Sequence, residues 1–398
     1  MGRAFQAVKV SEHVYWVGAI DWAIRDFHGY QTARGTTYNA YLVMADQITL
    51  IDTVKAPFLE EMFSRIASVV DPGRIENIIS NHSEMDHSGC LPEAIRRIKP
   101  KRVFASEMGV KALAGHFRMS EPIAAVKDGS SLSLGNMNLT FMETRMLHWP
   151  DSMISYLDAD ELLFSQDGFG MHLASAERFA DKIPEDLLVW EGAKYFANIL
   201  LPYSALILKL LDKVGKLGIP IKIIAPDHGP IWRQDLGKIL GLYGQWAAQK
   251  PTAKAVVVYD TMWQSTAVMA RAICDGLIAG GAVPVLLPMG ASHRSDAATQ
   301  ILDAGALVVG SPTLNNGLFP TMADVMTYLK GLKPKSKVGA AFGSFGWSGE
   351  APGILRDLLA EMKIESVADP LSVKYVPDEA ALLKCREMGL AVAEKMEK

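Results

Sequence analysis

Residues 81–89, with the sequence Asn-His-Ser-Glu-Met-Asp-His-Ser-Gly, limit what this chain can fold into more than any other stretch. They place His82, Glu84, Asp86 and His87 close together, directly after a short apolar run. A strand that ends in a loop here directs these side chains around one point. Imidazoles and carboxylates grouped this densely are typical of metal ligands, whereas the alternative is an ordinary polar turn rich in His and Asp. The pattern predicts a metal site at the end of this strand.

Three more potential ligands follow other apolar runs. His148 comes after a run at 141–147, Asp167 after 162–166 and His228 after 221–225, so each is expected near the end of a strand. One ion takes about four to six ligands, so seven ligands favour two ions that share a bridging carboxylate, with Asp167 as the candidate bridge. The remaining histidines are interpreted as core or surface groups, namely His13, His116, His172 and His293.

Composition restricts the class of protein and its surroundings. The 398 residues are 49% hydrophobic and 21% charged, which suits two or three globular domains. A net charge of -4 without a basic stripe argues against a nucleic-acid partner. The three scattered cysteines form no CxxC pair, which excludes a disulfide framework and suits a reducing cytosol. The N-terminus lacks a signal-peptide core, and the apolar stretch 195–211 is too interrupted to span a bilayer. We expect a cytoplasmic protein without a membrane segment.

The pattern of apolar residues predicts two domains, 1–250 and 251–398, joined by a linker at 249–252. The first has strands before residue 52, at 75–80, 102–105, within 124–168 and at 221–225, with helices at 58–70, 91–98, 174–217 and 235–248. This order suits an α/β sandwich with ligands on its loop edge. In the second domain, strands at 255–259, 284–287, 306–310 and 338–342 alternate with helices at 265–278, 297–303, 323–331 and 351–362. That alternation predicts a doubly wound parallel sheet.

Three loops of the second domain come after its predicted strands, at the edge where such sheets bind ligands. The first loop leads straight into a helix, and hydroxyls and free N–H groups at a helix N-terminus bind phosphate, although Ser and Thr are also ordinary helix caps. Trp263 and Trp347 suit the two sides of a flat ring, or else core packing. The candidate cofactor-binding residues are Thr261, Met262, Trp263, Gln264, Ser265, Thr266, Pro312, Thr313, Leu314, Asn315, Asn316, Gly317, Ser344, Phe345, Gly346 and Trp347.

The first domain resembles the metallo-β-lactamase fold. Hydrolases of that fold carry His-x-His-x-Asp-His and commonly bind zinc, whereas this chain has His82-x-Glu84-x-Asp86-His87. Anionic oxygen ligands favour iron or manganese over zinc, so the substitution favours a redox-active iron pair. The second domain resembles flavodoxin, which implies FMN. It departs from that pattern at Gln264, where flavodoxin loops often have glycine. The sequence lacks a dinucleotide fingerprint, a P-loop and a rubredoxin-like cysteine module, which implies an external electron donor.

Together the two domains resemble the flavodiiron proteins, also called A-type flavoproteins, over essentially the whole chain. The resemblance implies reduction of nitric oxide to nitrous oxide or of dioxygen to water, with electrons from rubredoxin or a similar carrier. It implies that one iron is bound by His82, Glu84, His148 and Asp167, and the other by Asp86, His87, Asp167 and His228. A solvent molecule is the alternative ligand at His87. His28 and Tyr195 match positions beside the irons, or else are a surface histidine and a core tyrosine.

The resemblance also implies a head-to-tail homodimer, alone or as a dimer of dimers, with Trp347 near the junction of flavin and iron.

Two other classes of function stay open from the residues alone. One is a di-metal hydrolase with a flavodoxin docking domain, against which Glu84 and the flavin loops argue. The other is an electron carrier without enzymatic activity, against which the complete set of seven metal ligands argues. FMN supplies two electrons and the pair of ferrous ions supplies two more, which matches four-electron reduction of dioxygen.

Overall fold

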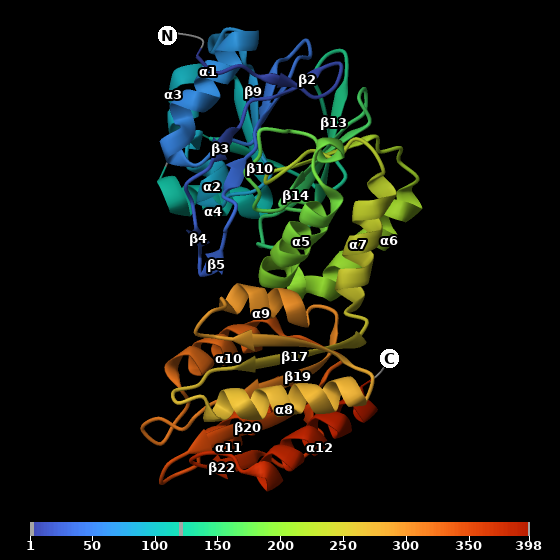
Figure 1. The fold of residues 1–398 in the computed structure, drawn as a ribbon. Helices are drawn as coiled ribbons and strands as arrows, with labels where there is room; N and C mark the ends of the chain where they lie inside the picture. Colours follow the sequence, from blue (N-terminus) through green and yellow to red (C-terminus); the bar gives the residue numbers. More distant parts are fainter. Residues whose placement is uncertain (1–3, 119–121, 397–398) are drawn as a thin grey trace. The chain divides into compact units, whose positions relative to one another are not determined.

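The computed structural model describes residues 4–118 and 122–396, which fold as two units (Figure 1). The first holds most of the chain up to Gly244 and the second most of the chain from Gln245. Gly29–Gln31 and Phe196–Ser204 also belong to the second unit. The division at 250/251 therefore stays a prediction. Residues 1–3 of the N-terminal segment in which we expect no signal peptide lie outside the described residues.

The first unit contains two facing sheets. The larger runs in the order β1-β2-β7-β8-β9-β10-β11, and its strands β8 to β11 are parallel. Its bounds are β1 Val8–Lys9, β2 Val14–Trp16, β7 Tyr41–Val43, β8 Thr49–Ile51, β9 Asn77–Ser80, β10 Arg102–Ser106 and β11 Ile123–Val126. The smaller runs β12-β13-β14-β15-β16, with β12 Ser131–Ser133, β13 Asn138–Glu143, β14 Met153–Leu157, β15 Leu162–Gln166 and β16 Ile223–Pro226. Shorter strands are β3 Ala19–Asp21, β4 Asp26–Phe27 and β6 Thr36–Tyr38, whereas β5 Tyr30–Gln31 belongs to the second unit.

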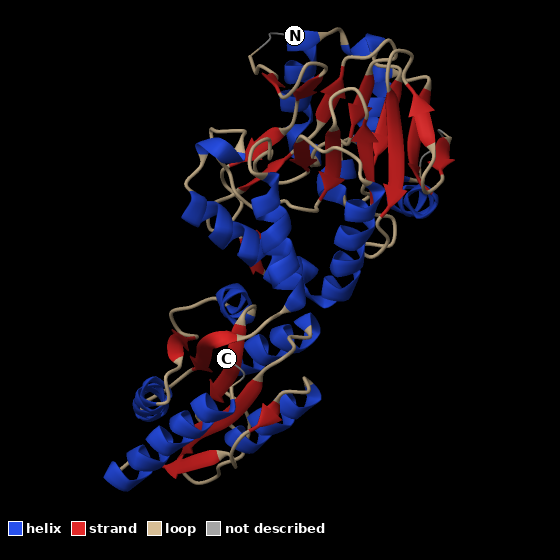
Figure 2. Cartoon of the chain, turned by 90° about the vertical axis from the view of Figure 1, so that its right-hand side faces the viewer, coloured by secondary structure: helices blue, strands red, loops and turns tan. Residues whose placement is uncertain are grey.

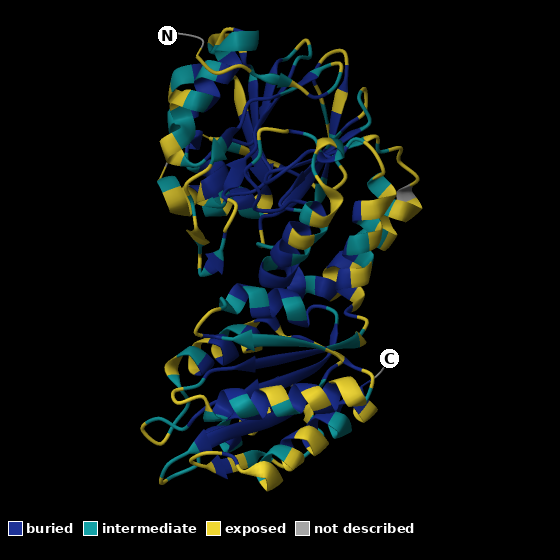
Figure 3. Ribbon diagram, in the orientation of Figure 1, coloured by how far each residue is buried: buried dark blue, intermediate teal, exposed yellow. Residues whose placement is uncertain are grey.

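Alternating apolar residues build one core between the sheets and another beneath the helices. Trp16, Tyr41 and Phe104 of the larger sheet meet Phe141 and Phe164 of the smaller one. On the other face of the larger sheet pack α1 (Leu59–Val69), α3 (Leu91–Ile98) and α4 (Glu107–Phe117). In Figure 3 the strands inside this unit are mostly dark blue, the colour of buried residues. The predicted α/β sandwich is confirmed.

Two helical segments of the first unit differ from the sequence prediction. Helix α4 was not predicted; Ser106 caps it by accepting a hydrogen bond from the amide of Gly109 at 2.9 Å. The helix expected from residue 174 begins only at Glu185, because Ala180–Lys182 is a 3-10 turn that precedes Pro184. The later helices are α5 (Glu185–Tyr195), α6 (Ser204–Leu217) and α7 (Leu236–Ala248).

Between α5 and α6 the chain forms a π-helical segment, Phe196–Leu200, and a 3-10 turn, Leu201–Tyr203. By length and composition, Glu185–Lys216 is apolar enough to cross a membrane. Core helices of soluble proteins pass the same test, and 44% of the most apolar window is buried inside the structure. The segment is therefore weak evidence for a membrane span.

The second unit is a parallel sheet with helices on both faces (Figure 2). Its order β18-β17-β19-β20-β21, with β22 also on β20, is that of a flavodoxin-like fold. Helices α8 and α12 cover one face, and α9, α10 and α11 cover the other. The bounds are β17 Thr252–Tyr259, α8 Ser265–Ala279, β18 Val283–Pro288, α9 Arg294–Ile301, β19 Ala304–Gly310, α10 Pro320–Leu332, β20 Val338–Phe345, α11 Ala351–Glu361, β21 Glu365–Ser366, β22 Leu371–Lys374 and α12 Glu379–Lys395. The predicted doubly wound sheet is confirmed.

Candidate metal centre and flavin cavity

The seven predicted metal ligands come from four segments of the first unit. His82 and Glu84 follow β9, and Glu84 is the N-cap of the short helix α2 (Met85–Ser88), which carries Asp86 and His87. Asp167 follows β15 and His228 follows β16. All four segments leave the sheets at one edge of the sandwich, as the sequence pattern predicted.

His148 reaches this edge by a different local structure from the one predicted. The strand expected to run up to it ends at Glu143, because the next residues form a turn. The amide of Thr144 donates to Ser152 O at 2.9 Å, and the amide of Met146 donates to Trp149 O at 2.8 Å. These two bonds hold the turn that presents His148.

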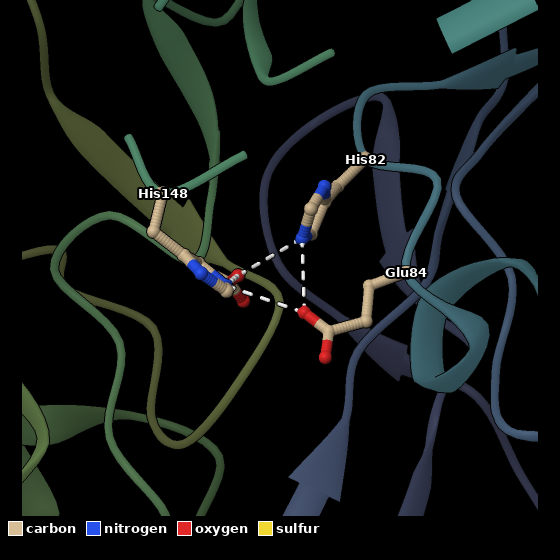
Figure 4. Close-up of side chains that lie close together, drawn as sticks. His82, Glu84 and His148 are labelled. Carbon is tan, nitrogen blue, oxygen red and sulfur yellow. Dashed lines mark hydrogen bonds and ion pairs between the residues drawn. The ribbon is translucent and has the colours of Figure 1, made fainter. Parts of the chain in front are cut away.

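The ligand atoms form two groups that meet at Asp167. In the first group, Nε2 of His148 lies 2.9 Å from Oδ2 of Asp167 and 3.3 Å from Oε2 of Glu84. Nε2 of His82 lies 3.3 Å from the same Glu84 oxygen, and Figure 4 shows these three side chains converging. In the second group, Oδ1 of Asp167 lies 3.3 Å from Nε2 of His87 and 3.5 Å from Nε2 of His228.

Asp86 completes the second group, with Oδ2 at 3.1 Å from Nε2 of His228 and 3.3 Å from Nε2 of His87. Asp167 therefore turns one oxygen toward each group, which is the geometry required of a bridging carboxylate. The ligand atoms of His82, Glu84, His148 and Asp167 lie within 4.8 Å of one another, close enough to hold one ion, and so do those of Asp86, His87 and His228.

Several of these buried atoms have no hydrogen-bond partner among the described residues. They include Oδ1 of Asp86, Nε2 of His87 and Oδ1 of Asp167. An unpaired buried polar atom is strongly unfavourable, so atoms left unpaired at one point indicate a ligand that binds there. Oxygen and imidazole donors in this mixture suit iron, so the residues present fit an iron pair.

The electrostatics of the site also favour cations. Burial raises the pKa of Asp167, but the imidazoles of His148 and His87 outweigh it and hold the pKa well below its usual value. Burial lowers the pKa of His87 and His148, but the surrounding carboxylates outweigh it and raise these values to about 10 and about 8. Without metal, protons on the imidazoles therefore balance the carboxylate charge.

We predict that iron binding is strongly pH-dependent, because iron must displace these protons. Below pH 8 the metal-free site holds protons on both His87 and His148, so affinity for ferrous ion should rise with pH. Each displaced proton contributes about tenfold in affinity per pH unit. Anaerobic titration of metal-free protein in buffers of different ionisation enthalpy measures the protons released. An affinity that stays constant over this range would contradict the prediction.

Groups behind the ligands orient the imidazoles. Nδ1 of His82 lies 3.1 Å from Oδ2 of Asp151, and Nδ1 of His228 lies 2.6 Å from the carbonyl oxygen of Thr37. Such contacts fix which ring nitrogen is free for a metal. Neither Asp151 nor Thr37 was predicted from the sequence. Asp151 carries a usable signal, because it lies three residues after His148, but nothing in the sequence marks the Thr37 carbonyl.

The two further candidates, His28 and Tyr195, occupy different environments. His28 is 76% exposed at its side chain, and its Nε2 lies 3.4 Å from Oε1 of Glu84. Tyr195 is buried, with its ring 6.0 Å from that of His228. Burial and then the charge of Asp167 raise the pKa of Tyr195 well above its usual value. His172, interpreted from sequence as a core or surface group, is buried with its ring 4.7 Å from that of His228.

A cavity of about 500 Å³ lies at the carboxyl edge of the parallel sheet in the second unit. Three of the lining residues were not predicted, namely Ser348, Tyr375 and Val376. The predicted residues that line it are Met262, Trp263, Ser265, Pro312, Thr313, Leu314, Asn315, Asn316, Ser344, Phe345, Gly346 and Trp347. Thr261, Gln264, Thr266 and Gly317 do not line it. Thr266 is fully buried, with its hydroxyl 2.9 Å from that of Ser344.

The two tryptophans of this cavity are not core residues. Trp263 is 90% exposed and Trp347 is 86% exposed, although both line the cavity. Large exposed aromatic side chains beside a cavity typically cover a ligand or a partner. With Ser265 at the start of α8, they fit a planar ring and a phosphate group.

Gln264, which stands where flavodoxin loops often have glycine, has the backbone conformation of a glycine. It adopts φ +68°, the left-handed region in which glycine is unstrained. We predict that Gln264→Val, which forces a β-branched residue into this region, lowers the unfolding free energy by about 1–2 kcal/mol. Gln264→Gly is the matched control and should unfold close to the parent. Thermal unfolding followed by flavin fluorescence separates the two variants, and equal melting of both would contradict the strain argument.

Two family models match different parts of the chain. Residues 36–229 match the model of the ODP family beta lactamase, and residues 257–389 match that of flavodoxin. A nitric oxide reductase of Moorella thermoacetica is 45% identical over 98% of this chain and 99% of its own length. A rubredoxin-oxygen oxidoreductase of Megalodesulfovibrio gigas is 44% identical over 98% of both chains.

Solved structures show the same similarity. The rubredoxin oxygen:oxidoreductase from Desulfovibrio gigas superposes with a TM-score of 0.96 at 44% identity, covering 98% of each chain. The flavodiiron protein from Giardia intestinalis superposes with a TM-score of 0.95 at 34% identity, covering 99% of this chain and 97% of that one.

A metallo-β-lactamase-like domain with two metal-ligand groups, followed by a flavodoxin domain, defines a class of metal- and flavin-dependent oxidoreductases. This chain belongs to the flavodiiron proteins within that class. Its cofactors are FMN and two non-haem iron ions.

Proposed function

We propose that this protein reduces nitric oxide to nitrous oxide, dioxygen to water, or both, at an iron pair that receives its electrons through FMN. The observation that carries the proposal is Asp167, which directs one carboxylate oxygen to each ligand group. Glu84 supports the same proposal, because it places an oxygen ligand where hydrolases of this fold have an imidazole. The names and full-length similarity of the relatives support the same activity.

We propose that His82, Glu84, His148 and Asp167 hold one iron and that Asp86, His87, Asp167 and His228 hold the other. FMN binds in the cavity of the second unit and is the second redox group of the protein. When bound, the cofactors supply two electrons from FMN and two from the iron pair. That number matches the reduction of one dioxygen, or of four nitric oxide molecules in two rounds.

The residues of the chain itself govern protons and water at this site. His28 is exposed and contacts Glu84, so it can carry protons between solvent and the first group. Burial raises the pKa of Tyr195, so its hydroxyl keeps its proton and can serve as a hydrogen-bond donor beside His228, whose ring lies 6.0 Å away. Buried aromatic rings around His228, including Tyr38, restrict water.

The electron donor is rubredoxin or a similar one-electron carrier. The name of the Megalodesulfovibrio gigas relative supports this assignment.

The three cysteines are free and buried, which supports operation in a reducing cytoplasm without disulfides.

We further propose a head-to-tail homodimer, or a dimer of dimers, in which the flavin of one subunit faces the iron pair of the other near Trp347. The exposure of Trp263 and Trp347 beside the cavity supports a partner surface there. Sedimentation of the active enzyme should show a dimer or larger species. An active monomer would contradict this arrangement.

Anaerobic turnover with reduced rubredoxin tests the function directly. Iron-loaded, FMN-bound protein should convert nitric oxide to nitrous oxide, measured by gas chromatography, or consume dioxygen at an electrode. Protein reconstituted with zinc provides the control and should do neither. Esterase activity of the zinc protein, with no gas reduction by the iron protein, would instead favour a hydrolase.

A further inference from the structure

The backbone on both sides of His228 is held by β6 and the residue that follows it. The amide of Asn39 donates to the carbonyl oxygen of Asp227 at 2.7 Å. The amide of Gly229 donates to Oγ1 of Thr37 at 2.7 Å. These bonds fix the main chain at His228, but the rotation of its imidazole about the side-chain bonds has to be fixed by other groups.

Two further buried polar side chains, Thr36 and His172, lie against the imidazole of His228. Oγ1 of Thr36 lies 2.8 Å from Nδ1 of His172 and 3.4 Å from Nδ1 of His228. The ring of His172 lies 4.7 Å from that of His228 and is inclined to it by 63°. All three residues are at most 2% exposed, so their contacts form inside the protein.

The hydroxyl of Thr36 is placed between two imidazoles. A threonine hydroxyl has one donor and two acceptor positions, so one oxygen can bond with both rings. Valine has the same branched shape and would fill this place on a strand without a polar atom to satisfy. A buried hydroxyl that faces both Nδ1 atoms therefore indicates a role toward the two rings, beyond packing.

We propose that Thr36 and His172 are positioning residues for His228, which hold its ring so that Nε2 points into the second ligand group. The inference rests on the proposed function, because it takes His228 as an iron ligand. A carbonyl oxygen can only accept, so Nδ1 of His228 carries a proton and donates it to Thr37 O at 2.6 Å. This single bond selects the nitrogen that is left for the metal, and the contacts with Thr36 and His172 restrict rotation of the ring.

His172 belongs to the same loop as the bridging carboxylate. The loop begins at Asp167 after β15, and the amide of Gly170 donates back to the carbonyl oxygen of Asp167 at 3.1 Å. The amide of Met171 then donates to the carbonyl oxygen of His228 at 3.3 Å. The loop thereby joins the bridge to the segment of His228 and brings His172 against its ring. We expect the positioning contacts to act on the second ligand group.

Anaerobic titration of metal-free, FMN-bound, full-length protein with ferrous ion tests the assignment. Thr36→Val keeps the shape of the side chain and removes the hydroxyl. We expect the Kd of one of the two iron equivalents to rise at least about tenfold, and that of the other to change by less than about twofold. Mössbauer spectra of the loaded variant should show a changed quadrupole splitting for one iron. Thr36→Ser restores the hydroxyl and should restore both the affinity and the spectrum.

Thr49→Val is the matched control. Thr49 is also a fully buried strand residue, and its hydroxyl donates to the carbonyl oxygen of Gln47 at 2.9 Å. It pairs with Asn77 at the start of β8 and β9, the opposite edge of the sheet from the ligands, so iron binding should equal that of the parent. Parental iron binding by Thr36→Val, or equal weakening in both valine variants, would overturn the positioning role alone. A parent that binds no pair of ferrous ions would overturn the proposed function.

A second pair of variants tests the same role at His172, should Thr36→Val not fold. His172→Phe keeps an aromatic ring and removes the hydrogen-bonding nitrogens, whereas His172→Asn keeps an amide atom near the position of Nδ1. Circular dichroism of the metal-free proteins shows whether each variant is folded before iron is added. We expect His172→Phe to weaken one iron equivalent at least about tenfold, and His172→Asn to weaken it by less. Parental affinity in folded His172→Phe would overturn the inference.

Discussion

Asp167→Asn should remove most iron from the protein and lower gas reduction by at least about 10³-fold. Asparagine has nearly the same shape, but it replaces one anionic oxygen by an amide nitrogen that cannot bind iron. Asp167 faces His148 at 2.9 Å through Oδ2 and His87 at 3.3 Å through Oδ1, so the substitution affects both groups. Metal analysis of the purified variant, together with nitrous oxide production, measures both effects.

Asp160→Asn is the matched control. Its side chain is also shielded from solvent, in the turn between β14 and β15, where it pairs with His13 at 2.5 Å instead of with a metal ligand. The control should keep its iron, and both variants should keep FMN, because the flavin cavity lies in the second unit. An Asp167→Asn protein with two irons and parental activity would show that the bridge is not needed.

Ser265→Glu should abolish FMN binding and with it donor-driven turnover, while the iron stays bound. Ser265 is the first residue of α8 and lines the cavity. A carboxylate there repels the flavin phosphate, and we expect affinity to fall by at least about 100-fold. A glutamate in the first turn is favourable to the helix itself, so the fold should not suffer. Flavin absorbance after purification and equilibrium titration with FMN give the measurement.

Ser265→Ala separates the charge effect from the loss of a hydroxyl. Removing one neutral hydrogen-bonding group should weaken FMN by about tenfold at most. The iron content of both variants should equal that of the parent. If the glutamate variant retained stoichiometric FMN, the phosphate would have to bind elsewhere in the cavity.

The sequence predicted the features that depend on local pattern. Alternating apolar runs located β9, β15 and β16, and the polar residues after them were the ones that the fold brings together. The same logic located the loops after β17, β19 and β20 that line the flavin cavity. A strand end must direct its next residues to one edge of its sheet, so these features need no knowledge of distant parts of the chain.

Features that depend on tertiary packing were not predictable in this way. The carbonyl of Thr37 orients His228 across 191 residues of sequence, and a backbone oxygen has no signature of its own. Helix α12 and strand β22 lie beyond the last predicted helix, although α12 packs against α8. The positive φ of Gln264 could not be predicted, because glutamine is not a residue type that typically adopts the left-handed region.

Each ligand group draws on both sheets of the sandwich. His82 and Glu84 leave the larger sheet at β9, while His148 and Asp167 belong to the smaller one; Asp86 and His87 likewise face His228 from the opposite layer. An ion bound in either group would therefore link the two sheets at the edge of the sandwich. Metal bound there replaces the protons of the imidazoles and joins ligands of both sheets, so metal binding should stabilise the packing of the two sheets as well as complete the centre.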